Sequence, residues 1–340
     1  MAKSAQRTFS YRSGVRVRDS VLACDATAGS DLVFLSHALA LDARAARLLP
    51  RPRSGKRQVL TTETTLNLLG SAGARLRPHA LTPAYGRPFA VGGMRLELFP
   101  SGHLPGAASL LCDLGEHRLV YAAPVAAPAA AAWGPPPEMR PAQALCIDGT
   151  FGLPQFRFPP YDSAIAAVRD HVLQARAAGR APVVLARPLG PALDVAVALA
   201  AAGVVVRAHR QVIAARAAWL AAGLPAPALL RFAGQLATGE ALLWPLEGRE
   251  AGMLKALPGT FIVLASGWAA DPVVTARLRP DVLVPLSNVG GFAELLAYVQ
   301  STGAREVAIR HAADDTLVQT LTARGLDAYR IGPPQQIPLF

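Results

Sequence analysis

Four side chains that could bind a metal ion or transfer a proton stand at the ends of apolar runs: His37, His103, Asp148 and His311. Residues 31–36 and 142–147 are two of these runs. Strands of an α/β sheet end at a common edge, where proteins of this class place their sites, so the four groups could converge there. The alternative is that each is an isolated residue held by local hydrogen bonds.

Apolar patterning predicts the elements that would position these residues. Strands are predicted at residues 31–36, 94–99, 117–122 and 142–147. Beyond residue 160, predicted strands alternate with predicted helices, as they do in βαβ units on a parallel sheet. We therefore expect an α/β protein in which residues 1–160 and 260–340 form one domain, interrupted by a second α/β unit at residues 161–259.

The net charge and the motifs of the chain limit which binding partners and which mechanisms are expected. The chain has 340 residues, a net charge of +11 and a pI near 10.4. A basic surface favours phosphate-bearing partners, because neutralising phosphates releases counterions. The alternative is that the positive charge reflects a codon bias toward arginine and that the protein has no phosphate-bearing partner. The sequence has no GxGxxG, Walker or GxSxG motif, which excludes a glycine-rich phosphate cradle as the mechanism.

Cysteine usage and hydropathy indicate the compartment. Cys24, Cys112 and Cys146 lie far apart and form no CxxC pair, so neither a zinc finger nor a disulfide framework is predicted. Their apolar surroundings predict that the thiols are small core residues. No apolar run free of charge and proline reaches 18 residues, and no signal peptide opens the chain. We expect a cytoplasmic protein without a membrane partner.

Several motifs follow one another in a recognisable order. They are Cys24-Asp25, Ser36-His37-Ala38, the segments PSGHLPGAA (100–108), DGTFGLP (148–154) and ASGW (265–268), Leu286-Ser287, and the stretch from Thr302 to His311. Together they resemble the bacterial DNA ligase-associated DNA exonucleases (mRNA 3′-end processing factor-like), which belong to the metallo-β-lactamase/β-CASP nuclease family. The last stretch is similar to the family pattern TGAxxVxxTHG. The resemblance extends over about residues 20–330.

This resemblance implies an architecture and an activity. Residues 1–160 and 260–340 would form a metallo-β-lactamase αββα sandwich, and residues 161–259 a β-CASP insert that covers the site and helps to form a nucleic acid groove. The activity of the family is metal-dependent hydrolysis of DNA or RNA phosphodiesters. Two zinc-like ions activate a water molecule and brace the phosphate in such sites.

The chain departs from the family pattern at the metal ligands. The family's His-x-His-x-Asp-His box falls on residues 37–42. His37 is kept and Asp42 replaces the last histidine, but Leu39 and Leu41 have no donor atom. We expect these two leucines to supply apolar packing in place of the ligands. A two-metal site needs more ligands than remain, so catalysis by the family mechanism is not expected.

Two further departures concern the bridging and proton-donating groups. The bridging aspartate falls on Pro124 and the β-CASP histidine on Val289. The residual metal ligands are His37, His103, Asp42 and His311, and the residual catalytic candidates are Asp148 and His311. No bound cofactor is expected. A single zinc or manganese ion on the residual ligands is the alternative.

A basic segment follows the degenerate box. Its charged residues are Arg44, Arg47, Arg51, Arg53, Lys56 and Arg57. They are predicted to contact nucleic acid phosphates, and a solvated basic face is the alternative. Aromatic residues make up only 6% of the chain, which argues against a base-stacking platform.

Three functions are compatible with these features. The leading hypothesis is a catalytically degenerate homologue of a metal-dependent exonuclease. It would bind DNA or RNA, or act as a partner subunit beside an active paralogue or DNA-repair proteins. The second hypothesis is a phosphodiesterase or nuclease with a rewired single-metal site. The third is an interaction protein whose basicity is only compositional.

Overall fold

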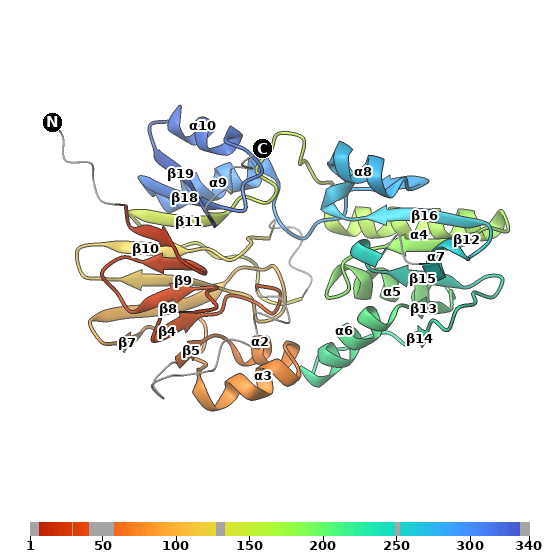
Figure 1. Ribbon diagram of the computed structural model, residues 1–340, viewed down its shortest axis with the longest axis horizontal. Coiled ribbons are helices and arrows are strands. Elements are labelled where there is room, and N and C mark those ends of the chain that lie inside the picture. Colours follow the sequence, from red (N-terminus) through yellow and green to blue (C-terminus); the bar gives the residue numbers. More distant parts are fainter. Residues whose placement is uncertain (1–6, 29, 41–57, 127–132, 249–251, 334–340) are drawn as a thin grey trace, which may run out of the picture. The chain divides into compact units, whose positions relative to one another are not determined.

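The computed structural model describes residues 7–28, 30–40, 58–126, 133–248 and 252–333. The chain divides into two compact units, and the described residues of Met1–Pro154 and Val289–Phe340 belong to the first and those of Gln155–Asn288 to the second. Both units combine sheets with helices, which confirms the predicted α/β class. Figure 1 labels most of the helices and strands of each unit.

The first sheet of the first unit runs in chain order. Its described strands are β1 (Phe9–Tyr11), β2 (Val15–Val17), β3 (Leu22–Cys24), β4 (Leu32–Phe34), β5 (Gln58–Leu60) and β6 (Ala80–Leu81). Strand β2 is antiparallel to both neighbours, whereas β3 to β6 are parallel. Helices α2 (Glu63–Leu68) and α3 (Ser71–Leu76) and the short η1 (Arg77–His79) lie between β5 and β6 in the sequence.

The second sheet of the first unit has the order β19-β18-β11-β10-β9-β8-β7. Its strands are β7 (Phe89–Val91), β8 (Met94–Pro100), β9 (Ala108–Asp113), β10 (Arg118–Tyr121), β11 (Ala144–Asp148), β18 (Glu306–Arg310) and β19 (Asp327–Ile331). Strands β7 to β10 are antiparallel, and β10, β11, β18 and β19 are parallel. The β11–β18 pair joins the two sequence segments of this unit in one sheet.

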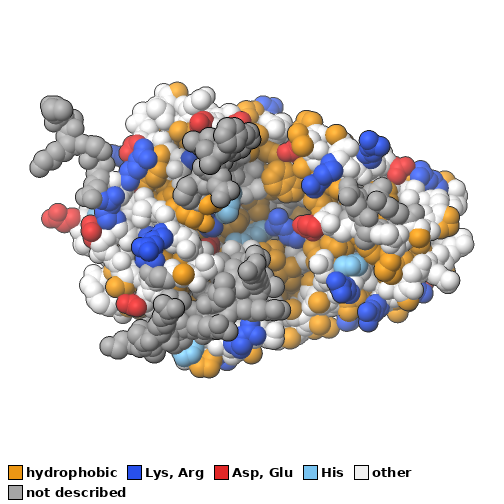
Figure 2. Space-filling model, viewed as in Figure 1, with side chains coloured by type: hydrophobic (Ala, Val, Ile, Leu, Met, Phe, Trp, Pro, Cys, Tyr) orange, Lys and Arg blue, Asp and Glu red, His pale blue; other side chains and the backbone are white. Residues whose placement is uncertain are grey.

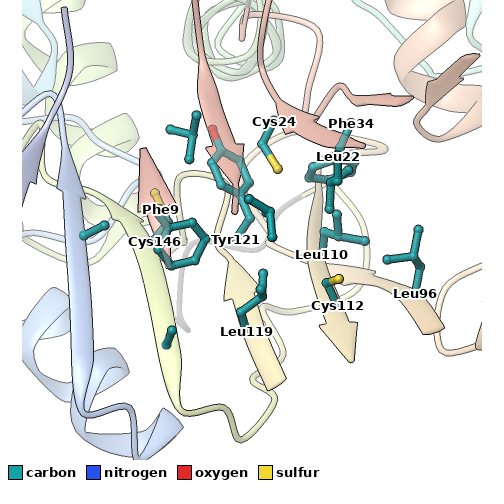
Figure 3. Close-up of a cluster of buried hydrophobic side chains, with 14 of the residues drawn as sticks. Phe9, Leu22, Cys24, Phe34, Leu96, Leu110, Cys112, Leu119, Tyr121 and Cys146 are labelled. Atoms are coloured by element: carbon teal, nitrogen blue, oxygen red, sulfur yellow. The ribbon is translucent and has the colours of Figure 1, made fainter. Parts of the chain in front are cut away.

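The two sheets pack face to face because alternate residues of each strand point to opposite sides. Tyr121 of β10 and Phe34 of β4 meet in the core between the sheets, with ring centroids 5.9 Å apart. Figure 3 shows these residues among apolar side chains of both sheets. Cys24, Cys112 and Cys146 are free, buried thiols in the same core, as predicted.

Helices cover the outer faces of both sheets. Leu295 of α9 (Phe292–Thr302) and Leu317 of α10 (Thr316–Thr322) pack with Val120 and Val307, which point outward from the second sheet. Helices α2 and α3 cover the first sheet with Leu66 and Leu76 in the same way. Burial of each large side chain contributes roughly 1.5–3 kcal/mol. The first unit therefore has four layers, with helices outside two sheets.

The second unit is built on one parallel sheet of order β14-β13-β15-β12-β16-β17. The strands are β12 (Ala181–Leu185), β13 (Val206–Ala208), β14 (Leu230–Arg231), β15 (Ala241–Trp244), β16 (Thr260–Ala265) and β17 (Val282–Val284). The helices are α4 (Tyr161–Ala177), α5 (Pro191–Ala201), α6 (Arg210–Ala221), η3 (Leu246–Gly248), α7 (Gly252–Lys255), η4 (Gly267–Ala270) and α8 (Pro272–Leu278). This alternation agrees with the βαβ pattern expected beyond residue 160.

The second unit continues further along the chain than the patterning suggested. Residues 260–288 were expected in the first domain, but β16 pairs with β12, and β17 pairs with β16. An apolar strand such as Thr260–Ala265 is buried in either arrangement, so its composition does not reveal which sheet it joins. Within the described residues, no helix is long and apolar enough to cross a membrane.

Candidate functional site

Polar side chains gather where parallel strands of the first unit end. Asp25 follows β3, and Ser36 and His37 follow β4. Asp148 and Arg310 are the last residues of β11 and β18. Strands β3 and β4 form one parallel pair, and β11 and β18 form another. The polar residues that end the two strands of a pair therefore lie at the same edge of their sheet. Arg310 Nη1 lies 3.0 Å from Asp25 Oδ2, so an ion pair joins the two sheets at this edge.

Asp25 is the centre of this cluster. Its side chain is only 1% exposed, and a carboxylate at such burial is stable only when paired and hydrogen-bonded. Its Oδ1 accepts from the backbone N–H of Ser36 at 2.9 Å. Its Oδ2 accepts from the hydroxyls of Ser36 and Tyr121, each at 2.7 Å, and from Arg310. These donors together compensate the buried negative charge.

Ser36 links the carboxylate to His37. The hydroxyl of Ser36 gives its proton to Asp25, and its oxygen lies 2.8 Å from His37 Nδ1. A hydroxyl has one proton, so His37 must donate its Nδ1–H to the Ser36 oxygen. In the neutral form of His37, this bond places the proton on Nδ1 and the lone pair on Nε2.

His103 is brought to His37 by a tightly held loop. The Gly106 carbonyl accepts from the hydroxyls of Thr62 and Thr65 at 2.6 and 2.9 Å. Gly106 has a φ of 76°, and a Cβ there would lie 2.7 Å from Thr62 Oγ1, so only glycine fits. The rings of His37 and His103 are both buried, with centroids 5.1 Å apart and planes at 73°.

His311 and Asp148 form the other part of the cluster. The Nε2 atom of His311 lies 3.9 Å from Asp148 Oδ2 and 3.1 Å from Arg310 Nη2. Arginine can only donate, so the shorter contact makes His311 Nε2 an acceptor and puts the proton on Nδ1. Gly149 allows the close approach of Asp148 to β18, because a Cβ at Gly149 would lie 2.5 Å from the Ile309 side chain.

Two residues of the cluster have backbones in the left-handed region. Asp25 has a φ of 46° and His311 a φ of 54°. Aspartate and histidine tolerate this region better than most residues, yet it remains unfavourable. Such conformations concentrate at functional sites, where the surrounding structure imposes them. Arg310 contacts both residues and so connects the two unusual backbones.

The described residues do not fit a catalytic metal ion. Such an ion needs about three protein ligands. Across the described ranges, no group of three or more His, Cys, Asp or Glu side chains could hold one. Within the described residues, His37 meets His103 and His311 meets Asp148, so each of these contacts brings two such side chains together. The Nε2 lone pair of His311 is also already engaged by Arg310.

Other predicted positions have mixed outcomes. Asp42 and Leu41, and the basic segment Arg44, Arg47, Arg51, Arg53, Lys56 and Arg57, lie outside the described residues. The expected apolar packing by Leu39 is wrong, because this residue is 38% exposed. Val289 is buried and forms a β-bridge with Ala126.

Sequence reasoning did not include Tyr121, Asp25 or Arg310 among the site residues. A signal was present for Asp25 and Arg310, since each ends an apolar run as the predicted histidines do, whereas Tyr121 is followed by further apolar residues. The ring of Tyr121 packs in the core. Its hydroxyl nevertheless reaches the site by donating to Asp25, beside Cys24 (Figure 3).

No known protein-family model matches the chain. A curated protein from Opitutus terrae, described as "Probable DNA ligase", is 27% identical to it over 254 residues. This similarity covers 71% of the chain but only 24% of the relative. The chain thus spans about a quarter of the length of the curated relative that it matches.

Proposed function

We propose that the chain is a catalytically degenerate homologue of the metallo-β-lactamase/β-CASP exonucleases. It would serve as a nucleic acid-binding or partner subunit in DNA repair. One observation carries this proposal: His311, a metal ligand in the family pattern, accepts a hydrogen bond from Arg310, which is paired with Asp25. Side chains of the protein therefore occupy the contacts that a metal ion would need.

The layers of the first unit support the family assignment. Two sheets with helices on both outer faces are what the resemblance implies for a metallo-β-lactamase sandwich. The all-parallel second unit interrupts that unit in the sequence, as a β-CASP insert would. We propose residues 155–288 as the extent of the insert.

The relative supports a place beside a DNA ligase. A segment similar to this chain is part of a much longer protein whose name is "Probable DNA ligase". We propose that this chain acts on, or near, the DNA that a ligase seals.

The charge of the chain supports contact with phosphates. The net charge is +11, and in Figure 2 basic side chains are scattered singly and in small groups over the visible face. Scattered cations favour weak binding without sequence preference, because phosphate contacts carry no sequence information. The segment from Arg44 to Arg57 holds six of the 34 lysine and arginine residues that make up this charge and is our candidate for the main contact.

Fluorescence anisotropy with labelled duplex and single-stranded DNA tests this function. We expect binding whose log affinity falls by about 0.9 per phosphate contact for each unit of log salt on duplex DNA. Replacing Arg51, Arg53, Lys56 and Arg57 by alanine should flatten this slope. A matched control replaces four exposed arginines elsewhere, Arg75, Arg95, Arg277 and Arg324. Equal slopes for both variants, or no binding at low salt, would contradict the proposal.

The contact between His37 and His103 favours one alternative, a hydrolase with a single metal ion. Two buried imidazoles at this separation could provide two of its ligands. Nuclease assays with zinc or manganese distinguish the two functions. Degradation of DNA by the wild-type protein, abolished by His103→Ala, would establish the alternative.

A further inference from the structure

Arg310 lies between two groups of a kind that binds metal ions in other proteins, a carboxylate and an imidazole. Its side chain is 12% exposed. Its Nη1 donates to Asp25 Oδ2 at 3.0 Å and its Nη2 to His311 Nε2 at 3.1 Å. Its Cζ lies 5.2 Å from the centroid of the Tyr121 ring. A guanidinium is planar and permanently charged, so it is a fixed cation at this position.

Both contacts of Arg310 use lone pairs that a metal ion would need. His311 Nε2 accepts from Arg310, and the Asp25 carboxylate already receives donors at both oxygens. A divalent ion at His311 would have to break the Arg310 bond. It would also approach a positive charge held in place by Asp25, and like charges repel strongly at such burial.

The family pattern also distinguishes residue 310. The family pattern TGAxxVxxTHG has threonine before its last histidine, and this chain has Arg310 there. Arg310 compensates Asp25 from within the chain, across a sequence separation of 285 residues.

We propose that Arg310 is a positioning residue that replaces a metal ion, because its guanidinium neutralises Asp25 and holds His311. It also excludes divalent cations from this edge of the first unit. The comparison with a metal rests on the proposed function, whereas the charge arrangement rests on the side-chain contacts. The first unit is accordingly expected to fold without a metal ion.

Thermal unfolding of the full chain with EDTA or with zinc chloride tests this proposal. The test variant is Arg310→Thr. The control is Arg330→Thr, which removes an exposed arginine of β19, the strand next to β18; this arginine is paired with Asp315, the residue before α10. Wild type and control should have the same midpoint in EDTA and in zinc. In EDTA, Arg310→Thr should melt roughly 6–20 °C lower, because it leaves a buried charge unpaired. Zinc should raise the midpoint of this variant.

Three results would overturn the proposal. The first is a wild-type midpoint that zinc raises as much as that of Arg310→Thr. The second is an Arg310→Thr midpoint in EDTA equal to that of the control. The third is no effect of zinc on Arg310→Thr, which would show that Arg310 does not keep the metal out.

A second variant decides the matter if Arg310→Thr does not fold. The pair Asp25→Asn with Arg310→Met removes both charges, and asparagine also tolerates a positive φ at residue 25. We expect this double variant to fold and to bind no zinc. If Asp25→Asn folds alone but the double variant does not, neutralisation of Asp25 is not the role of Arg310. None of these measurements involves DNA, so a failure to bind DNA would refute only the proposed function.

Discussion

Removing the hydroxyl of Tyr121 tests whether the Asp25 network stabilises the first unit. This buried hydroxyl donates to Asp25 Oδ2 at 2.7 Å. Tyr121→Phe deletes the donor but keeps the ring that packs edge-on to Phe34. A hydrogen bond to a charged group contributes about 1.5–3 kcal/mol. Asp25 keeps its donors from Ser36 and Arg310, so we expect a loss of about 2 kcal/mol in the free energy of unfolding.

Urea unfolding followed by far-UV circular dichroism measures this loss. Three of the four tryptophans, Trp219, Trp244 and Trp268, lie in the second unit, so tryptophan fluorescence reports mainly on the unfolding of that unit. Comparing the fluorescence curve with the circular dichroism curve shows which unit is destabilised. The midpoint should fall with little change in the denaturant slope. Tyr11→Phe, on the exposed side of β1, is the control. A Tyr121→Phe variant within about 0.5 kcal/mol of this control would refute the reasoning.

Three further predictions concern the core, the thiols and the degenerate box. Phe34→Ala should cost about 3–5 kcal/mol in urea unfolding, because the ring is fully buried between the two sheets. Burial raises the pKa of the Cys24 and Cys146 thiols, so above pH ~8.5 the unfolded chain binds fewer protons than the folded one. Stability should therefore fall as the pH rises beyond that value, and Cys146→Ala should make the fall less steep. Leu39→His should change stability by less than about 0.5 kcal/mol, since the side chain is 38% exposed, and should yield no zinc-dependent nuclease activity in a DNA degradation assay. If this single change produced nuclease activity, the claim that several metal ligands are missing would be contradicted.

Long or strongly apolar elements were predictable from the sequence. The strand Ala144–Asp148 has a continuous apolar run, and the helix Tyr161–Ala177 has apolar residues at helical spacing. Three-residue strands such as Val15–Val17 and Leu22–Cys24 were missed, because so short a segment shows too little periodicity to be distinguished from a loop.

The sequence suggests the positions of the candidate residues, but it does not indicate which of them meet in the structure. The rule that polar residues follow apolar runs identified His37, His103, Asp148 and His311. Whether those residues meet each other depends on how the two sheets are packed. The bond from Arg310 to Asp25 crosses 285 residues of sequence and forms only when both sheets are in place. No local pattern indicates that an arginine will bind the aspartate.

Metal content combined with nuclease activity tests the central claim, a degenerate metal site, most directly. Protein purified without chelators is dialysed against buffer with zinc or manganese and then against metal-free buffer, and its metal content is measured by elemental analysis. The same samples are assayed on single-stranded and duplex DNA. We predict less than stoichiometric metal and no degradation of either DNA, because the described residues provide only pairs of ligands. Two tightly held metal ions per chain, with DNA degradation that His311→Ala abolishes, would contradict the account.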